Sequence, residues 1–243
     1  MKLFLNSAFI FYTLGFIIVI AYHFTKKPIL EKLSKSALVT GLISHTISLL
    51  IRTYETGHAP MANMYETLLF YSWSTVLVSM IVIFRYDERL TEIITIPVAL
   101  LAMVFAGMNE KQGAPLTLIL NTRWFETHVI SSFAAYALFT LAFSGAVLYL
   151  FFASKDNPPQ EKLKTFQDIA SRSILWGFSL FSFSMFSGAI WAYLAWGTYW
   201  LWEPKVIWSF IVWFYYAGAM HAYYVREWRG RGLATATVIG FFV

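Results

Sequence analysis

The stretch that decides the fold is SILWGFSLFSFSMFSGAIWAYLAWGTYWLW, residues 173–202, which contains no Asp, Glu, Lys or Arg. A helix needs about 20 mainly apolar residues to cross the hydrocarbon core of a bilayer, and this run exceeds that length. The second half of the run is also crowded with aromatic rings. The same stretch is therefore the first place to look for a function.

Charge-free runs recur along the whole chain. They cover residues 3–24, 36–51, 67–84, 93–109, 127–154, 173–202 and 206–225. The 36–51 run is short, but Lys35 and Arg52 at its ends are expected to extend their charged groups to the interfaces. The sequence therefore predicts an all-α, polytopic transmembrane helix bundle with seven complete spans. We expect residues 1–243 to form a single integral membrane domain, with a Trp-rich outer loop at 196–207.

A further apolar stretch begins at Gly232 and reaches Val243, the last residue of the sequence. It is shorter than the roughly 20 residues of a span, so we expect a truncated eighth span here. The first run, 3–24, lacks a small-residue cleavage site and is expected to be a retained span rather than a signal peptide.

The composition agrees with a membrane protein. The chain is 58% hydrophobic and only 13% charged, about half the charged fraction of a typical soluble domain. The net charge of +5 is interpreted as a topology signal rather than as a sign of nucleic-acid binding. The chain has no Cys, which excludes disulfides and Cys-based metal sites.

The basic residues predict an orientation. Thirteen of the 18 Lys and Arg residues lie in the alternate connecting segments 25–35, 85–92, 155–172 and 226–231. The positive-inside rule places these segments on the cytoplasmic side. The N-terminus and the segments 52–66, 107–126 and 196–206 are then outside. Within the inner segment 155–172, the charged piece from Gln160 to Arg172 is expected to be an interfacial helix.

The outer segment 196–206 lies within a cluster of Trp. Six of the ten Trp residues are Trp191, Trp196, Trp200, Trp202, Trp208 and Trp213. An aromatic belt at the interface is one explanation, but no inner segment has a comparable cluster. A concentrated group of indoles also suits a flat, hydrophobic ligand that stacks on them. Gly197 and Pro204 are expected to shape the backbone of this loop.

Five His residues are candidates for chemistry, each with an ordinary alternative. His23 is expected to have a structural role, and His58, in an outer loop, is expected to be solvated. His45 lies within a span, where a functional His and a His bonded to a neighbouring helix are equally consistent with the sequence. His128 begins a span at the outer surface, and His221 lies near the inner end of another. Both are candidate ligands for haem iron, since neutral imidazole binds it well.

The Trp-rich segment, with Gly188 and Trp191 before it, resembles the WWD domain of haem-handling proteins, most closely the CcsA/ResC family. Members of that family are the membrane subunit of the system II cytochrome c synthase. Other stretches share the resemblance: Gly57–Pro60 with Asn63, Tyr65, Glu66 and Trp73; Trp124–His128; and His221 followed by Trp228–Gly230. The family usually has Asp at the position of Glu203 and Glu at that of Val206. Its second external His lies beyond the eighth span, past the last residue of this sequence.

The resemblance implies a function in cytochrome c biogenesis. Haem b, as substrate, would be held near the inner side by His221 and a CcsB/ResB partner, and then move to the outer loop. There it would meet the predicted binding residues Trp191, Trp196, Gly197, Tyr199, Trp200, Trp202, Glu203 and Trp208, with His128 on the iron. The complex would act as a haem lyase on the Cys-x-x-Cys-His segment of an apocytochrome c. The membrane would be the bacterial inner membrane or the thylakoid membrane, whose lipid surrounds the spans.

Three other functions stay open at this point. One is a haem-delivery subunit without synthase activity, similar to CcmC. Another is a small-molecule membrane transporter with an aromatic vestibule, although no carboxylate pair lies within a span. The third is a membrane scaffold whose Trp cluster is only a belt.

Overall fold

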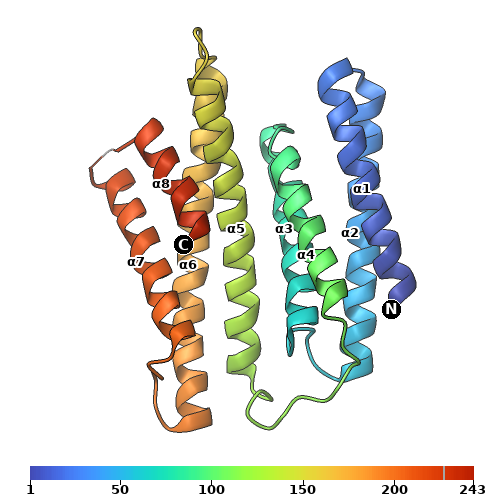
Figure 1. The fold of residues 1–243 in the computed structure, drawn as a ribbon, viewed down its shortest axis with the longest axis vertical. Coiled ribbons are helices and arrows are strands. Elements are labelled where there is room, and N and C mark those ends of the chain that lie inside the picture. Colours follow the sequence, from blue (N-terminus) through green and yellow to red (C-terminus); the bar gives the residue numbers. More distant parts are fainter. Residues whose placement is uncertain (227) are drawn as a thin grey trace. The chain divides into compact units, whose positions relative to one another are not determined.

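The computed structural model describes residues 1–226 and 228–243, and within them the regular structure is α-helical (Figure 1). The helices are α1 (Lys2–Thr25), α2 (Pro28–Thr56), α3 (Met64–Tyr86), α4 (Glu92–Met108), α5 (Arg123–Ala153), α6 (Gln160–Trp196), α7 (Pro204–Tyr224) and α8 (Arg231–Phe242). The prediction of an all-α fold is confirmed. Glu227, within the predicted inner segment 226–231, lies outside the described residues.

Five of these helices are long and apolar enough to cross a membrane, namely α1, α2, α3, α5 and α6. The apolar helices α4 and α8 are shorter, with 17 and 12 residues. The prediction of a membrane protein with several spans is therefore confirmed.

The chain divides into two compact units, Met1–Thr117 and Leu118–Val243. Unit 1 contains α1 to α4, and unit 2 contains α5 to α8. The single integral membrane domain expected from the sequence stays a prediction, and each unit is described by itself below.

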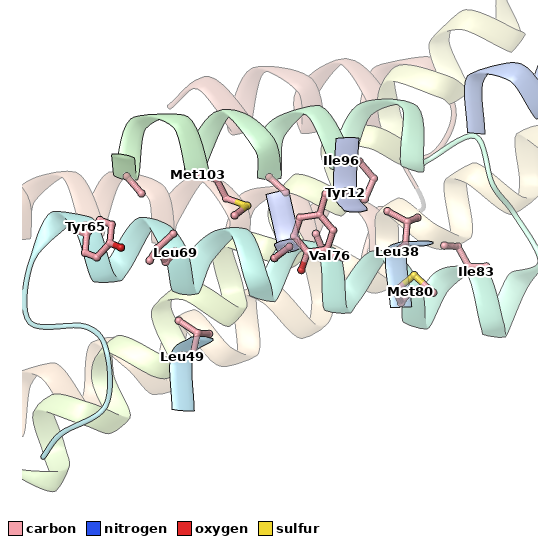
Figure 2. Close-up of a cluster of buried hydrophobic side chains, with 13 residues drawn as sticks. Tyr12, Leu38, Leu49, Tyr65, Leu69, Val76, Met80, Ile83, Ile96 and Met103 are labelled. Atoms are coloured by element: carbon pink, nitrogen blue, oxygen red, sulfur yellow. The ribbon is translucent and has the colours of Figure 1, made fainter. Parts of the chain in front are cut away.

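Unit 1 is held together by close helix packing around one hydrophobic cluster. Gly15 and Gly41 bring α1 and α2 together, because a Cβ on Gly15 would lie 2.7 Å from Leu38 and one on Gly41 would lie 2.7 Å from the Tyr12 ring. Small residues allow such close backbone approach between helices in membranes. The larger cluster members drawn in Figure 2 are Tyr12, Leu38, Leu49, Tyr65, Leu69, Val76, Met80, Ile83, Ile96 and Met103.

Two buried ion pairs lie in unit 1. Arg52 contacts Glu66 at 2.8 Å, and Arg89 contacts Glu92 at 2.7 Å. The expectation that Arg52 extends to the interface is wrong, because its side chain is only 6% exposed. Arg52 also donates to the carbonyl oxygen of Lys111, so the pair fixes the segment that follows α4.

Unit 2 is built on the long antiparallel helices α5 and α6. Gly145 on α5 lets α6 come close, since a Cβ there would lie 3.0 Å from the Phe166 carbonyl oxygen. This contact explains why the expected separate interfacial helix is wrong. Residues 160–172 are the first part of the continuous 37-residue helix α6, and Phe166 and Ile169 are buried. α7 joins the pair through Tyr216, whose ring stacks on Phe139 with centroids 3.8 Å apart.

Candidate functional site

In unit 2 the loop 197–203 joins α6 to α7 (Figure 1). A pocket of about 400 Å³ lies at this junction. It is lined by His128, Met185, Gly188, Ala189, Trp191, Ala192, Trp196, Tyr199, Trp200, Leu201, Glu203, Lys205, Val206 and Ser209. This volume is within the range of small-molecule sites, about 300–1,000 Å³. The walls combine flat aromatic rings with the imidazole of His128, the carboxylate of Glu203 and the ammonium group of Lys205.

His128 is the potential metal ligand of this pocket. It lies in the second turn of α5, a helix that begins after Thr122, whose side chain accepts a hydrogen bond from the Phe125 N–H. The imidazole Nδ1 is 2.8 Å from the carbonyl oxygen of Ser184 on α6. A carbonyl oxygen only accepts hydrogen bonds, so Nδ1 carries the proton and Nε2 keeps its lone pair. His128 is therefore held in the tautomer that can bind a metal through Nε2.

Gly188 makes the position of His128 possible. A Cβ at residue 188 would lie 2.6 Å from His128 Nδ1 and 2.8 Å from Cε1. No side chain larger than hydrogen fits there unless the imidazole moves. Ser184, Gly188 and Trp191 follow one another at helical spacing, so α6 presents the hydrogen-bond acceptor, the clearance and a stacking ring on one face.

Trp191 connects His128 to the rest of the aromatic wall. Its ring stacks on the imidazole with centroids 6.1 Å apart and meets the Trp196 ring edge-on at 5.0 Å. Its indole N–H donates to the carbonyl oxygen of Ile119 at 2.8 Å. The indole N–H of Trp191 is therefore already paired. A ligand in the pocket would contact Trp191 through its ring instead.

The loop backbone adopts the shape predicted from Gly197 and Pro204. Gly197 ends α6 in the left-handed conformation, with φ of 73°, and its N–H donates to the Tyr193 carbonyl oxygen. Glycine takes this conformation without steric cost. Pro204 occupies the first turn of α7, where the missing N–H costs nothing. The expected shaping of the loop by these two residues is confirmed.

The pocket gathers part of the predicted binding set. Trp191, Trp196, Tyr199, Trp200, Glu203 and His128 line it, whereas Gly197, Trp202, Trp208 and His221 do not. Gly197 acts through the backbone. Trp202 and Trp208 are 76% and 58% exposed, and the Trp202 ring lies beside Phe210.

Other residues of the pocket were not singled out in the sequence. Met185, Ala189 and Ala192 lie on the same face of α6 as Gly188 and Trp196. Their spacing of three and four residues is the signal that could have identified them. Lys205 and Ser209, in the first turns of α7, also reach the pocket.

His221 lies apart from this pocket, on the exposed face of α7. Ile207, Ile211, Phe214 and Gly218 precede it on that face at spacings of three and four residues, and all are exposed. The result is an apolar stripe that ends in an imidazole.

The remaining His residues have neighbours in unit 1. His23 Nε2 lies 3.4 Å from the Arg89 carbonyl oxygen, and His45 Nδ1 lies 3.3 Å from the Tyr12 hydroxyl. His58 is only 6% exposed, and its Nε2 lies 2.9 Å from the Ala114 carbonyl oxygen. The expectation that His58 is solvated is therefore wrong.

Similar proteins agree on one family. The profile of the family described as "Cytochrome C assembly protein" matches residues 61–243. The "Cytochrome c biogenesis protein CcsA" of Prochlorococcus marinus (strain AS9601) is 32% identical, over 88% of this chain and 81% of its own. The protein of the same name from Gloeobacter violaceus is 27% identical, over 91% of this chain and 84% of its own.

A solved structure shares the fold. The "Cytochrome c Heme Lyase CcmF" superposes with a TM-score of 0.68 over 99% of this chain, at 15% sequence identity. The chain spans 45% of the length of that protein, so this likeness describes the fold alone. From the profile match and the CcsA relatives, the chain belongs to the cytochrome c assembly protein family, as a homologue of the cytochrome c biogenesis protein CcsA.

Proposed function

We propose that this protein binds haem in the α6–α7 pocket and presents it for covalent attachment to an apocytochrome c. The observation that carries the proposal is the hydrogen bond from His128 Nδ1 to the Ser184 carbonyl oxygen. Metal-binding His residues commonly donate their other ring N–H to such a partner, which fixes the tautomer and the ring orientation. His128 would bind the haem iron through Nε2, as imidazole ligands do.

The walls of the pocket suit a porphyrin. Trp191, Trp196 and Trp200 supply flat, polarisable surfaces that favour stacking. Lys205 and Glu203 lie at the start of α7 and also line the pocket. The Lys205 ammonium would pair with a haem propionate, because a cation and a carboxylate attract strongly where water is partly excluded.

We further propose that His221 holds haem before it reaches this pocket. An exposed imidazole within a span is unfavourable against lipid, so the α7 stripe is expected to be covered by a partner resembling CcsB/ResB. That partner would supply the second axial ligand. The proposed orientation has the N-terminus and the loop 197–203 on the outer side, with seven complete spans. Haem then enters from the cytoplasmic side of a bacterial inner membrane or a thylakoid membrane.

The attachment step would use the thiols of the apocytochrome. Each Cys S–H of a Cys-x-x-Cys-His segment adds across one haem vinyl group, so that sulfur bonds to one carbon and the proton goes to the other. The addition is balanced and needs no external oxidant or reductant. The chain itself contains no Cys, so no thiol of its own competes for the vinyl groups.

His128→Ala, in the protein purified with its partner subunit, tests the proposal. The matched control is Thr127→Ala, since Thr127 is its neighbour on α5 and its hydroxyl donates to the Arg123 carbonyl oxygen rather than to a residue that lines the pocket. We expect His128→Ala to retain haem at His221 and to lose cytochrome c maturation. Added imidazole should restore part of the maturation, because it can occupy the vacated ligand position. Maturation and a visible spectrum equal to those of Thr127→Ala would refute the proposal.

His221→Ala distinguishes the remaining functions. Loss of haem from the purified complex is expected if His221 is the first ligand. A haem-delivery subunit without synthase activity predicts the same spectrum, but covalent attachment in a purified system would then need a further protein. A small-molecule transporter predicts substrate flux and no haem in either variant.

A further inference from the structure

A second pocket, of about 440 Å³, lies in unit 1 and is not used by the proposed function. It is bounded by the start of α1, the end of α2, the start of α3 and the segment that follows α4. Figure 1 shows that segment passing the end of α2 close to the N-terminus. The volume is within the range of small-molecule sites, about 300–1,000 Å³, so the chemistry of the walls can indicate a ligand.

The segment after α4 is held in place as one wall of this pocket. Lys2, at the start of α1, forms an ion pair with Glu110 at 2.7 Å. Arg52, near the end of α2, donates to the carbonyl oxygen of Lys111 at 3.0 Å. The pocket is therefore a built feature of unit 1, closed by contacts from two helices.

The guanidinium of Arg52 lies at the buried side of the pocket. Its Nε and Nη2 contact the Glu66 carboxylate, and Nη2 also bonds to the segment after α4. Its Nη1 has no hydrogen-bond partner among residues 1–226 and 228–243. Nη1 faces Gly113, another residue of the pocket, where a Cβ would lie only 3.2 Å away. Because guanidinium nitrogens only donate hydrogen bonds, Nη1 indicates an acceptor as its partner.

Tyr65 adds a second donor beside this guanidinium. Tyr65 is only 2% exposed, and the centroid of its ring is 5.6 Å from Arg52 Cζ. Both side chains line the pocket, and the phenol hydroxyl can donate a hydrogen bond. Hydrogen bonds from a guanidinium to a carboxylate or phosphate are about twice as strong as those between neutral groups. The buried side of the pocket therefore favours an anionic oxygen.

The remaining charged side chains leave one free group of each sign. The two ion pairs described above neutralise Arg52 and Lys2. The ammonium group of Lys111 and the carboxylate of Glu55 also line the pocket, and neither forms an ion pair within the described part of the chain. A ligand with a single charge would meet one of these groups with like sign, whereas a zwitterion complements both.

Apolar side chains adjoin the pocket. Leu3 follows Lys2 and is 74% exposed, and Met64 precedes Tyr65 and is 61% exposed. The helices α1, α2 and α3 are each long and apolar enough to cross a membrane. The ends of these helices, where the pocket lies, are then expected at the level of the lipid headgroups.

We propose that this pocket binds the headgroup of a zwitterionic phospholipid. The phosphate would accept hydrogen bonds from Arg52 and Tyr65, and a primary ammonium group would donate to Glu55. An ethanolamine phospholipid carries both groups, and its acyl chains would lie along the exposed apolar side chains of α1 and α3. A free zwitterion carries the same charged groups without the chains.

Native mass spectrometry of the full chain, purified in detergent and freed of lipid, tests the site. Two phospholipids with the same acyl chains are added separately: phosphatidylethanolamine, which has the ammonium group, and phosphatidylglycerol, which lacks it. We expect phosphatidylethanolamine to bind several-fold more tightly. Equal affinities for the two lipids, or a preference for phosphatidylglycerol, would overturn the proposal.

Two variants assign the headgroup contacts. Glu55→Gln removes the charge at nearly constant size and should abolish the preference for phosphatidylethanolamine. Its control is Glu126→Gln, since Glu126 does not line the pocket. Tyr65→Phe should weaken the binding of both lipids, whereas Tyr54→Phe, at a 91% exposed position outside the pocket, should not. An unchanged lipid preference in Glu55→Gln would contradict the assignment.

Soluble phosphoethanolamine distinguishes the two sources of this chemistry. It has the phosphate and the ammonium group but no acyl chains. We expect it to displace bound phosphatidylethanolamine only at concentrations far above that of the lipid. Displacement as effective as that by a second phosphatidylethanolamine would show that the ligand is a free zwitterion, and would overturn the assignment to a lipid.

Discussion

Gly188 allows the orientation of His128 to be changed while the imidazole itself is kept. In Gly188→Ala the new Cβ would lie 2.6 Å from His128 Nδ1, whereas ordinary contact begins at 3.4 Å. The ring must retreat from α6 by close to an ångström. That movement lengthens the 2.8 Å bond from Nδ1 to the Ser184 carbonyl oxygen beyond the usual range of about 2.7–3.2 Å.

The expected result is weaker haem binding in the α6–α7 pocket. Loss of the group that accepts the hydrogen bond of a metal-binding His typically reduces metal affinity or activity about 10- to 100-fold. This corresponds to about 1.4–2.8 kcal/mol. The assay is cytochrome c maturation at matched protein level, together with the visible spectrum of the purified complex. The control is Gly107→Ala on α4, where an added Cβ meets nothing within 4 Å.

A double-mutant cycle separates positioning from a general effect on folding. If Gly188 acts through His128, then Gly188→Ala should cost nothing further in a His128→Ala background. Wild-type maturation in Gly188→Ala, beside its loss in His128→Ala, would refute the argument from geometry. Additive losses would show that the added methyl group damages the pocket in another way.

Three further predictions follow from the geometry. Trp200→Ala should reduce haem affinity about 5- to 150-fold, by analogy with base stacking at roughly 1–3 kcal/mol per ring. Trp202→Ala should change haem affinity little, because Trp202 does not line the pocket. Equal losses of affinity in the two variants, measured by haem titration, would contradict this. Arg52→Ala should destabilise the protein by about 3–5 kcal/mol, because it leaves the Glu66 carboxylate buried and unpaired. Thermal unfolding followed by circular dichroism measures this, and a melting temperature equal to that of wild type would disprove it. A Cys introduced at Thr198 should react with an impermeant thiol reagent from the outer side, and labelling only after the membrane is opened would reverse the proposed orientation.

The charge pattern was sufficient to predict the helices, because a bilayer imposes one simple requirement on length and polarity. Each charge-free run overlaps a helix, although the run 173–202 continues beyond the end of α6 at Trp196. Gly197 and Pro204 end and begin helices as expected. The continuity of α6 was missed. The charged segment from Gln160 resembles a surface helix in sequence, whereas the close contact at Gly145 that buries it depends on another helix.

The site was predictable only in part, for a similar reason. The Trp cluster indicated the region in which the pocket lies, because its members are neighbours in sequence. The pairing of His128 with Ser184 joins residues 56 positions apart, and no local pattern encodes it. The sequence could not distinguish Trp202 and Trp208, which do not line the pocket, from Trp196 and Trp200, which do. The direction in which each ring points depends on how α6, the loop 197–203 and α7 are arranged in space.

The length of α6 has a consequence for the kind of substrate the protein can receive. Its 37 residues extend about 55 Å at 1.5 Å per residue, whereas the hydrocarbon core of a bilayer is about 30 Å thick. The charge-free part begins only at Ser173, so the excess length lies on the side of Gln160. Trp196, at the opposite end of α6, is then expected near the membrane–water interface. A water-soluble polypeptide could reach the pocket there without entering lipid, while an apolar molecule could approach the same rings from within the membrane.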